Sequence, residues 1–384
     1  MKNPKLLSDL GTEEQKPPRF PGFFLNRRRL LQGLLSLGAG GGALLAGTRL
    51  SATQAAPHGE SSPAPQGMEH SPDNGTHTTG HGEYLVKERA SEAEIEALTA
   101  RVKPLRPKDP MEALTSFDRG TVTRLADGTV QREYVMIAED AEIEIAKGVK
   151  YPAWTYNGFV PGPTIRATEG DKLKIHFFNK GSVPHTIHFH GIHGASMDGV
   201  FEMVPPGGKF TYEFAAEPFG LHLYHCHTMP LKKHLEKGLY GAFIIDPKTP
   251  RPPAKELVMV MNGYDTDMDG ENEFYTVNGV ANYFLDHPVP LRAGEPVRIY
   301  LVNVTEFDLI NSMHIHAQFF KLYRTGTRLE QHEITDTVML CQGERCILEF
   351  AYSIPGRYMF HAHQSEFAEL GWMGFFKVEG PPAA

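Results

Sequence analysis

One stretch, residues 221–241, constrains the fold of this chain more than any other, and its sequence is LHLYHCHTMPLKKHLEKGLYG. Aromatic and β-favouring residues run into it from the turn Pro218-Phe219-Gly220, so we expect a strand at its centre. Side chains alternate along a strand, so His225 and His227 point to one face and Cys226 points to the other. One strand therefore offers two imidazoles to one metal centre and a thiolate to a second.

A further histidine, His234, follows seven residues after His227, near enough to return to the thiolate side. A cysteine with two histidines is the trigonal ligand set that a blue copper ion takes, with a weak axial fourth ligand. A His-Cys-His sequence is also a short covalent bridge between an electron-accepting copper and a neighbouring cluster. The stretch therefore predicts a copper site that is joined to a second metal site.

Histidines spaced two apart recur as four His-x-His pairs along the chain. The pairs are His188 and His190, His225 and His227, His314 and His316, and His361 and His363. The offsets between the corresponding pairs are similar, 314 − 188 = 126 and 361 − 225 = 136, and two tandem copies of one fold explain them. Packing alone is a poor explanation, because eight buried imidazoles would each need a partner. The pattern therefore predicts metal ligands.

From about residue 117 onward, short β-rich runs alternate with turns such as Asp127-Gly128 and Pro206-Gly207-Gly208, as is typical of a sandwich or barrel. Four prolines within residues 247–253 mark a join. We therefore expect an all-β fold of two tandem domains, residues 117–248 and 254–380. The length of 384 residues and the 41% hydrophobic content suffice for two cores. The net charge of −8 argues against nucleic acid as a partner.

Residues 1–56 contain Arg27 and Arg28, then a glycine-rich apolar stretch over 30–46 and small residues at 52–56. This segment resembles a twin-arginine export signal, so we expect a mature protein that works in the periplasm or outside the cell. A membrane anchor is the alternative, but glycines interrupt the apolar stretch and make a stable span less favourable. No other segment is apolar enough to cross a bilayer.

We expect residues 57–116 to form a flexible linker with one short helix. Residues 57–83 are rich in Ser, Pro, Gly and Thr, which is typical of solvated low-complexity sequence. A copper-gathering tail is the alternative, because this part carries His58, Met68, His70, His77 and His81. The sequence Ser91-Glu92-Ala93-Glu94 predicts a capping box that opens a helix ending near Arg101.

Together, the motifs over residues 117–379 resemble those of the multicopper oxidases, and specifically of their two-domain, laccase-like members. The resemblance implies two cupredoxin-like Greek-key domains and a trinuclear copper cluster that reduces dioxygen to water. It also implies that His190 and one histidine of the pair His314 and His316 bind the type 2 copper. By position, the eight cluster ligands are His188, His190, His225, His227, His314, His316, His361 and His363.

The same resemblance implies that the blue, type 1 copper takes His185, Cys226 and His234. Leu239 stands where many relatives have an axial methionine. Other residues occupy the corresponding places in the second half, namely Asn311, Ala362, Phe367 and Trp372. We therefore expect one blue copper, in domain one, and four coppers per chain.

Two further features leave alternatives open. Asp198, in Ser-Met-Asp-Gly, resembles the acidic residue near the type 2 copper that would serve catalysis, and the alternative is a turn aspartate with no catalytic role. Cys341 and Cys346 flank the tight turn at residues 342–345, and they form either a disulfide or two unpaired thiols.

The expected function is an exported multicopper oxidase that oxidises phenols or similar small organic donors and reduces O2. A copper nitrite reductase is the first rival, because it shares the two-domain layout, although that family has an Asp at the position of His188. A non-catalytic copper-handling protein is the second rival. Each domain offers four cluster histidines, and two-domain relatives join the halves between subunits, so we expect a homotrimer with interfacial trinuclear clusters.

Overall fold

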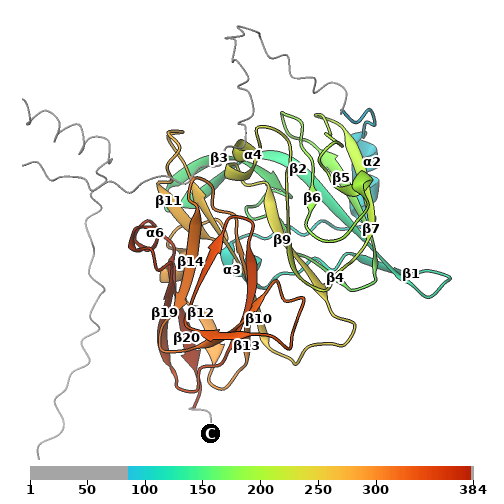
Figure 1. Cartoon of the computed structure of the whole chain (residues 1–384). Coiled ribbons are helices and arrows are strands. Elements are labelled where there is room, and N and C mark those ends of the chain that lie inside the picture. Colours follow the sequence, from blue (N-terminus) through green and yellow to red (C-terminus); the bar gives the residue numbers. More distant parts are fainter. Residues whose placement is uncertain (1–84, 382–384) are drawn as a thin grey trace, which may run out of the picture. The chain divides into compact units, whose positions relative to one another are not determined.

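The computed structural model describes residues 85–381, and twenty strands in four sheets dominate them (Figure 1). The all-β fold expected from the sequence is confirmed. The predicted export signal and the His- and Met-bearing part of the predicted linker lie outside the described residues. No helix within residues 85–381 has the length and the apolar character needed to cross a bilayer.

The first two sheets contain the strands up to residue 246, and the long hairpin of β2 and β3 belongs to the first sheet. One sheet has the order β1-β2-β5-β7, with β3 paired to β2, and the other has the order β4-β9-β8-β6. Their bounds are β1 Thr121–Arg124, β2 Val130–Ala146, β3 Val149–Tyr156, β4 Ile165–Thr168, β5 Lys172–Asn179, β6 His188–Phe189, β7 Lys209–Ala215, β8 Gly220–His225 and β9 Tyr240–Asp246.

The other two sheets begin at residue 255. Their orders are β11-β10-β13-β18-β15-β16 and β12-β20-β19-β14-β17. Their bounds are β10 Lys255–Tyr264, β11 Phe274–Val277, β12 Val289–Arg292, β13 Val297–Asn303, β14 Ile310–Ile315, β15 Phe320–Arg324, β16 Glu333–Thr335, β17 Thr337–Cys341, β18 Arg345–Phe350, β19 Gly356–His361 and β20 Met373–Glu379.

The two halves repeat one pairing scheme. Parallel pairing joins β2 to β5 and β4 to β9 in the first half, and it joins β10 to β13 and β12 to β20 in the second. Antiparallel pairing joins β6 to β8 and, correspondingly, β14 to β19. The tandem repeat inferred from the histidine offsets is therefore visible in the backbone as well.

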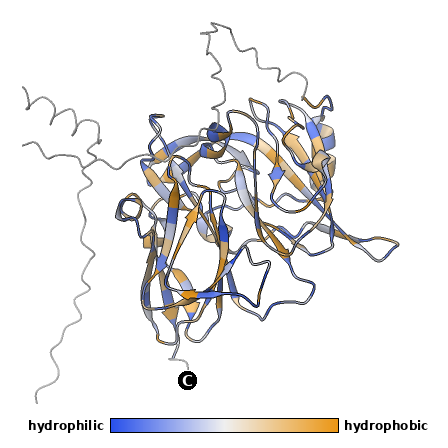
Figure 2. Cartoon of the chain, viewed as in Figure 1, coloured by the Kyte–Doolittle hydropathy of each residue, from blue (hydrophilic) through white to orange (hydrophobic). Residues whose placement is uncertain are grey.

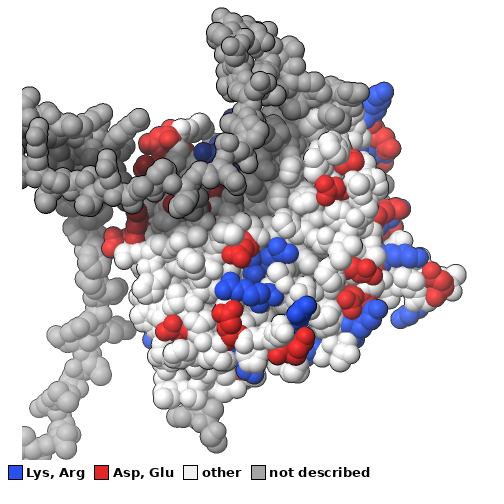
Figure 3. Space-filling model, in the orientation of Figure 1, with Lys and Arg blue, Asp and Glu red and all other residues white. Residues whose placement is uncertain are grey.

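Hydrophobic and hydrophilic residues are interspersed along the strands of both halves (Figure 2), as strands with one buried face require. Each half has its own apolar core, and a third apolar cluster contains residues of both halves, among them Leu221, Leu223, Val258 and Val302. A buried ion-pair network also joins the halves, because Arg166 contacts Asp246 at 2.8 Å and Glu256 at 2.6 Å. On the face shown in Figure 3, basic and acidic side chains are interspersed.

The segment expected to be a flexible linker packs against both halves over its described part, residues 85–116. Helix α2 (Glu92–Arg101) begins at Ser91, whose side chain accepts a hydrogen bond from the Glu94 amide. Its Ile95 is buried against Val135, Ile137 and Phe178. An unexpected second helix, α3 (Pro110–Thr115), buries Leu114 in the core of the second half. Burial of these apolar side chains holds the segment in place, and a linker without apolar contacts lacks that stabilisation.

The remaining helices are short and lie in loops. They are α4 Leu231–Glu236, α5 Tyr283–Asp286, α6 Ser365–Glu369 and the 3₁₀ turn Ala195–Met197.

Candidate metal centres

The structure brings the expected type 1 ligands together in the first half. Cys226 directly follows β8, His234 lies on α4, and His185 is held by a short backbone bridge to Val204. Cys226 Sγ lies 3.2 Å from His234 Nδ1 and 4.0 Å from His185 Nδ1, and the two Nδ1 atoms are 3.2 Å apart. All three side chains are buried. One sulfur and two imidazole nitrogens that converge on one point form the donor set of a blue copper.

The surroundings of this group keep it dry and uncharged in the absence of metal. Burial lowers the pKa of His185 to about 3 and that of His234 to about 4, so both imidazoles are neutral and ready to bind a cation. Burial also raises the pKa of the Cys226 thiol. The ring of Trp154 packs against both histidines, with centroid distances of 5.2 Å and 4.8 Å.

Two backbone contacts fix the sulfur and the expected axial residue. The Thr186 amide donates to Cys226 Sγ at 3.4 Å, and the Cys226 amide donates to the carbonyl of Leu239 at 3.0 Å. Leu239 is fully buried in the core of the first half. Its backbone therefore lies beside Cys226, and its role as the axial residue stays a prediction.

A second group lies at the end of β6 and β8. The Nε2 atoms of His190 and His225 are 3.2 Å apart, and the ring of His188 lies 5.0 Å and 5.2 Å from theirs. His227 completes the set, with its ring 5.6 Å from that of His188. His188 Nδ1 lies 2.8 Å from the carbonyl of Asp198, and His225 Nδ1 lies 2.9 Å from that of Cys226. Each Nδ1 thus donates to a carbonyl, which leaves Nε2 unprotonated for a metal.

The second half reproduces this histidine quartet at the end of β14 and β19. The Nε2 atoms of His316 and His361 are 3.0 Å apart, and the ring of His363 lies 5.5 Å from that of His314. His314 Nδ1 lies 2.9 Å from the Asp336 carbonyl, and His361 Nδ1 lies 2.6 Å from the Ala362 carbonyl. The two quartets are therefore equivalent in both grouping and anchoring.

Burial keeps several of these imidazoles in the neutral form that binds metal ions. It lowers the pKa of His190 to about 3 and that of His225 to about 4, and it lowers the pKa of His188, His316 and His361 as well. Neutral imidazole is the ligating form. Within residues 85–381, the groups of converging ligand atoms never combine histidines of the two quartets.

The second half has no blue-copper donor set among the described residues. Ala362 replaces the cysteine, and Phe367 and Trp372 fill the corresponding space within the apolar core. Asn311 is buried and donates to the Thr305 hydroxyl at 2.9 Å instead of facing a thiolate. This agrees with a single blue site in domain one.

Asp198 lies beside the first quartet, and its catalytic role stays a prediction. Its carboxylate Oδ1 is 3.3 Å from His188 Nδ1, and it is partly open to solvent. Asp336 holds the same place in the second half, with Oδ2 4.0 Å from His314 Nδ1. The sequence reasoning missed Asp336, although its offset from Asp198, 336 − 198 = 138, is close to that of the histidine pairs.

The sheets show whether the two remaining cysteines, Cys341 and Cys346, form a disulfide. Cys341 is exposed at the end of β17, whereas Cys346 is buried on β18, which belongs to the other sheet of the same half. Both are unpaired thiols in the structure. The tight turn between them redirects the chain from one sheet to the other, so closeness in sequence did not indicate a disulfide.

One further acidic group was not anticipated. Asp265, Asp267, Asp269 and Glu273 converge in the loop between β10 and β11. The amides of Asp269 and Gly270 donate to the Asp265 carboxylate at 3.2 Å and 2.8 Å, so the loop itself satisfies this buried acid. The run Asp-x-Asp-x-Asp-Gly was a visible signal for the group.

Two tandem sandwiches with a buried Cys-His-His set and two histidine quartets define a copper protein of the cupredoxin class. Comparisons with known proteins agree. Family models described as "Multicopper oxidase" match residues 138–250 and 250–381. A solved structure described as "Crystal structure of multicopper oxidase" is 55% identical and has a TM-score of 0.70, and the match covers 71% of this chain and 98% of that one. This chain belongs to the multicopper oxidase family.

Other relatives carry different names. A blue copper oxidase from Nitrosomonas europaea is 27% identical with a TM-score of 0.59, and the match covers 65% of this chain and 86% of that one. The copper-containing nitrite reductase of Neisseria gonorrhoeae is 33% identical over 255 residues, or 61% of this chain. The match spans 64% of that curated relative, slightly less than two thirds of its length.

Proposed function

We propose that this chain is an exported, laccase-like oxidase that takes single electrons from phenols or similar small donors and reduces O2 to water. The observation that carries the proposal is the pair of equivalent histidine quartets, because their eight imidazoles match the number of ligands expected for a three-copper cluster. When bound, the coppers would accept electrons at the blue site and deliver four of them to O2. The donors and the solvent supply the four protons.

The chain's own residues would connect the two sites. Cys226 belongs to the blue set, and its sequence neighbours His225 and His227 belong to the first quartet, so a covalent path links the two. The contact between His225 Nδ1 and the Cys226 carbonyl at 2.9 Å adds a hydrogen-bonded path. Asp198 and Asp336 lie beside His188 and His314, where they can hold protons for the reduction.

The symmetry of the quartets revises one ligand assignment. His190 faces His225 as His316 faces His361, whereas His188 and His314 are the matching pair with Nδ1 held by an aspartate carbonyl. We therefore assign the type 2 copper to His188 and His314, and we assign the type 3 pair to the other six histidines. This proposal differs from the expectation, drawn from the resemblance, that His190 binds the type 2 copper.

Each quartet alone is half a cluster, so we also propose that domain one of one chain meets domain two of the next. Two apolar side chains that follow histidine pairs closely in sequence are open to solvent, with Ile192 65% and Phe319 60% exposed. Exposed apolar surface of this kind is typical of an interface. A head-to-tail contact must close into a ring, and a trimer is the ring that the resemblance implies. The twin-arginine motif at Arg27 and Arg28 supports export to the periplasm or beyond.

Nitrite reduction is the second candidate, because several curated relatives carry that name. His188 argues against it, since the resemblance places an Asp at that position in nitrite reductases. The test gives the copper-loaded protein 2,6-dimethoxyphenol in an oxygen electrode and, separately, nitrite with a reduced dye. We expect one O2 to be consumed for four donor electrons and no nitric oxide to form. Nitric oxide formation without oxygen uptake would instead establish the second candidate, and neither activity would leave a copper-handling role.

A further inference from the structure

The three side chains of the blue set have almost no contact with solvent. Cys226 and His185 are 0% exposed and His234 is 3% exposed. An electron donor in solution therefore cannot reach the edge of a ligand imidazole, and its electron has to cross the side chains that cover the set. The side chain that touches both the ligands and the solvent decides where the electron enters.

One aromatic ring packs on both histidines of the set. Within residues 85–381, the ring contacts of His185 and His234 are with each other and with Trp154. The planes of the indole and the two imidazoles are inclined at 65° and 54°, which is the edge-on packing that aromatic rings prefer. Trp154 therefore contacts two of the three expected ligands at once.

Trp154 also reaches the surface. On β3 its neighbours Ala153 and Thr155 are buried, whereas Trp154 is partly exposed. Lys233, an exposed residue of α4, has its Nζ 5.8 Å from the centre of the Trp154 ring, within the range of a cation–π contact. The same ring is thus open to solvent and in contact with the ligand imidazoles.

The backbone holds this ring in place beside the ligands. The Trp154 amide donates to the carbonyl of Lys237 at 2.9 Å, and Lys237 Nζ donates to the carbonyl of Pro152 at 3.1 Å. A Cβ placed on Gly238 would lie only 3.0 Å from the Trp154 carbonyl, so strand and loop are closely packed here. Strand β3 is therefore tied to the loop that follows His234.

We propose that electrons enter the blue site through the indole of Trp154 and not through the edge of a ligand imidazole. The inference rests on the proposed function and names the residue that would carry the first electron-transfer step. A one-electron donor at the exposed part of the indole loses one electron, cupric copper held by the set becomes cuprous, and the indole is unchanged. The Lys233 cation opposes a positive charge on the ring, so the ring serves as a bridge and is not itself oxidised.

The test removes the ring with Trp154→Leu and keeps a smaller aromatic ring with Trp154→Phe. Trp372→Phe is the matched control, because Trp372 is the second of only two tryptophans and is fully buried in the core of the other half. Stopped-flow absorption follows the anaerobic bleaching of the blue band by hexacyanoferrate(II) and by hexaammineruthenium(II), two donors of opposite charge. Optical spectra and redox titration record the state of the blue site in every variant.

A second measurement needs no copper and tests the exposure of the ring. Iodide should quench the fluorescence of copper-free Trp372→Phe, which keeps Trp154, and should hardly quench that of Trp154→Phe, which keeps the buried Trp372. Fluorescence of Trp372→Phe that resists iodide would overturn the inference, because Trp154 would then be closed to solvent.

We expect Trp154→Leu to slow the bleaching at least tenfold with both donors, while the blue band and its reduction potential stay as in the wild type. Trp154→Phe should slow the bleaching at least twofold, and it decides the outcome if Trp154→Leu binds no blue copper. Trp372→Phe should bleach at the wild-type rate. Unchanged or faster bleaching without the indole would overturn the inference, because the ring would then only cover the site. Slowing that a shift in the potential accounts for would overturn it as well.

Bleaching requires no O2, so the inference and the proposed function fail separately. Slower bleaching in Trp154→Leu together with a wild type that consumes no O2 would refute the oxidase function and leave the entry route standing. Oxygen consumption by the wild type together with unchanged bleaching in Trp154→Leu would refute the entry route alone.

Discussion

His188 lies directly opposite His225 across the antiparallel pair of β6 and β8, and His314 lies opposite His361 in the same way across β14 and β19. Equivalent strand ends therefore carry equivalent metal ligands in both halves. The repeat explains why each half presents four imidazoles and why neither half supplies enough for a three-copper cluster. The proposed assembly between chains rests on this arrangement, and complementation between two variants can test it.

Complementation between two inactive chains tests the shared cluster. His188→Ala damages the first quartet and His314→Ala the second, so each chain alone should form only defective interfaces. In a random mixture, an interface is intact when an undamaged domain one meets an undamaged domain two, which gives roughly a quarter of wild-type activity. Co-expression followed by oxygen-uptake assays measures this fraction.

The chain that carries both substitutions is the control, and it should recover nothing when mixed with either single variant beyond what that variant shows alone. A copper-loaded, fully active monomer in light scattering would contradict the assembly. So would a complete absence of rescue when both single variants fold and bind blue copper.

Replacement of the Cys226 sulfur distinguishes the spectrum of the blue site from that of the histidine quartets. Cys226→Ser removes the thiolate that converges with His185 and His234 at 4.0 Å and 3.2 Å. The intense blue absorption should disappear, because it requires a copper–thiolate bond, while the type 2 EPR signal from the quartets should remain. Cys346→Ser is the control, since that buried thiol lies in the apolar core of the other half and belongs to none of the converging ligand groups among the described residues. Blue colour that survives Cys226→Ser would show that the sulfur ligand is misassigned.

Leu239 sets a prediction for the reduction potential. A leucine cannot coordinate, so a copper with this axial neighbour has three ligands, and its cuprous state is favoured. Leu239→Met adds a thioether donor and should lower the potential by about 59 mV or more, which is a tenfold change in the equilibrium constant of a one-electron couple. Redox titration of the blue band measures the shift. A clearly smaller fall, or a rise, would mean that Leu239 is not the axial residue.

The buried carboxyl of Asp118 gives a pH-dependent stability in the copper-depleted protein. Burial raises its pKa to about 6, while the Gly120 amide donates to one of its oxygens at 2.9 Å. A folded pKa above the unfolded one stabilises the fold at low pH, and this stabilisation is lost as the pH rises through about 6. The loss amounts to at most about 3 kcal/mol, at ~1.4 kcal/mol per pKa unit.

Asp118→Asn keeps an acceptor for Gly120 and removes the ionisable group. Urea unfolding should therefore show the variant to be more stable than the wild type at pH 7.5 and the difference to shrink or reverse at pH 4. Asp127→Asn at an exposed turn is the control. The Thr129 amide donates a hydrogen bond to the carboxylate of Asp127 and lowers its pKa to about 2, so this group stays ionised from pH 4 to pH 7.5. A stability difference for Asp118→Asn that is constant from pH 4 to pH 7.5 would contradict the assignment.

The sequence predicted the parts of this molecule that depend on short-range pattern. Alternation along a strand predicts that His225 and His227 lie apart from Cys226, and the repeat offset predicts the correspondence of the two quartets. Functional residues that recur at a fixed spacing can be recognised from the sequence alone. Asp336 belongs to this class too, and the same offset would have found it.

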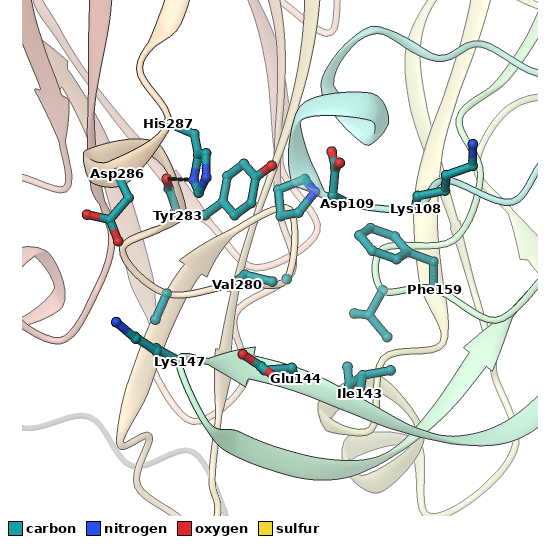
Figure 4. Close-up of a pocket in the computed structure, with 14 residues that line it drawn as sticks. Lys108, Asp109, Ile143, Glu144, Lys147, Phe159, Val280, Tyr283, Asp286 and His287 are labelled. Carbon is teal, nitrogen blue, oxygen red and sulfur yellow. Dashed lines mark hydrogen bonds between the residues drawn. The ribbon is translucent and has the colours of Figure 1, made fainter.

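Other features depend on contacts that no local pattern encodes. The packing of residues 85–116 depends on apolar partners far along the chain, such as those of Ile95 on β2 and β5. Cys341 and Cys346 are five residues apart yet lie in different sheets. The cavity that Figure 4 shows is lined by four separate segments, which lie within residues 108–110, 143–147, 159–160 and 279–287.

The copper content of the purified protein distinguishes a trinuclear cluster from a single type 2 copper. Elemental analysis, combined with optical and EPR spectra on the same sample, counts the coppers and separates their types. We expect four per chain: one blue, one type 2 and two in an EPR-silent coupled pair. Two coppers per chain in a fully loaded protein, one blue and one type 2, would contradict the trinuclear cluster and favour a nitrite reductase-like site.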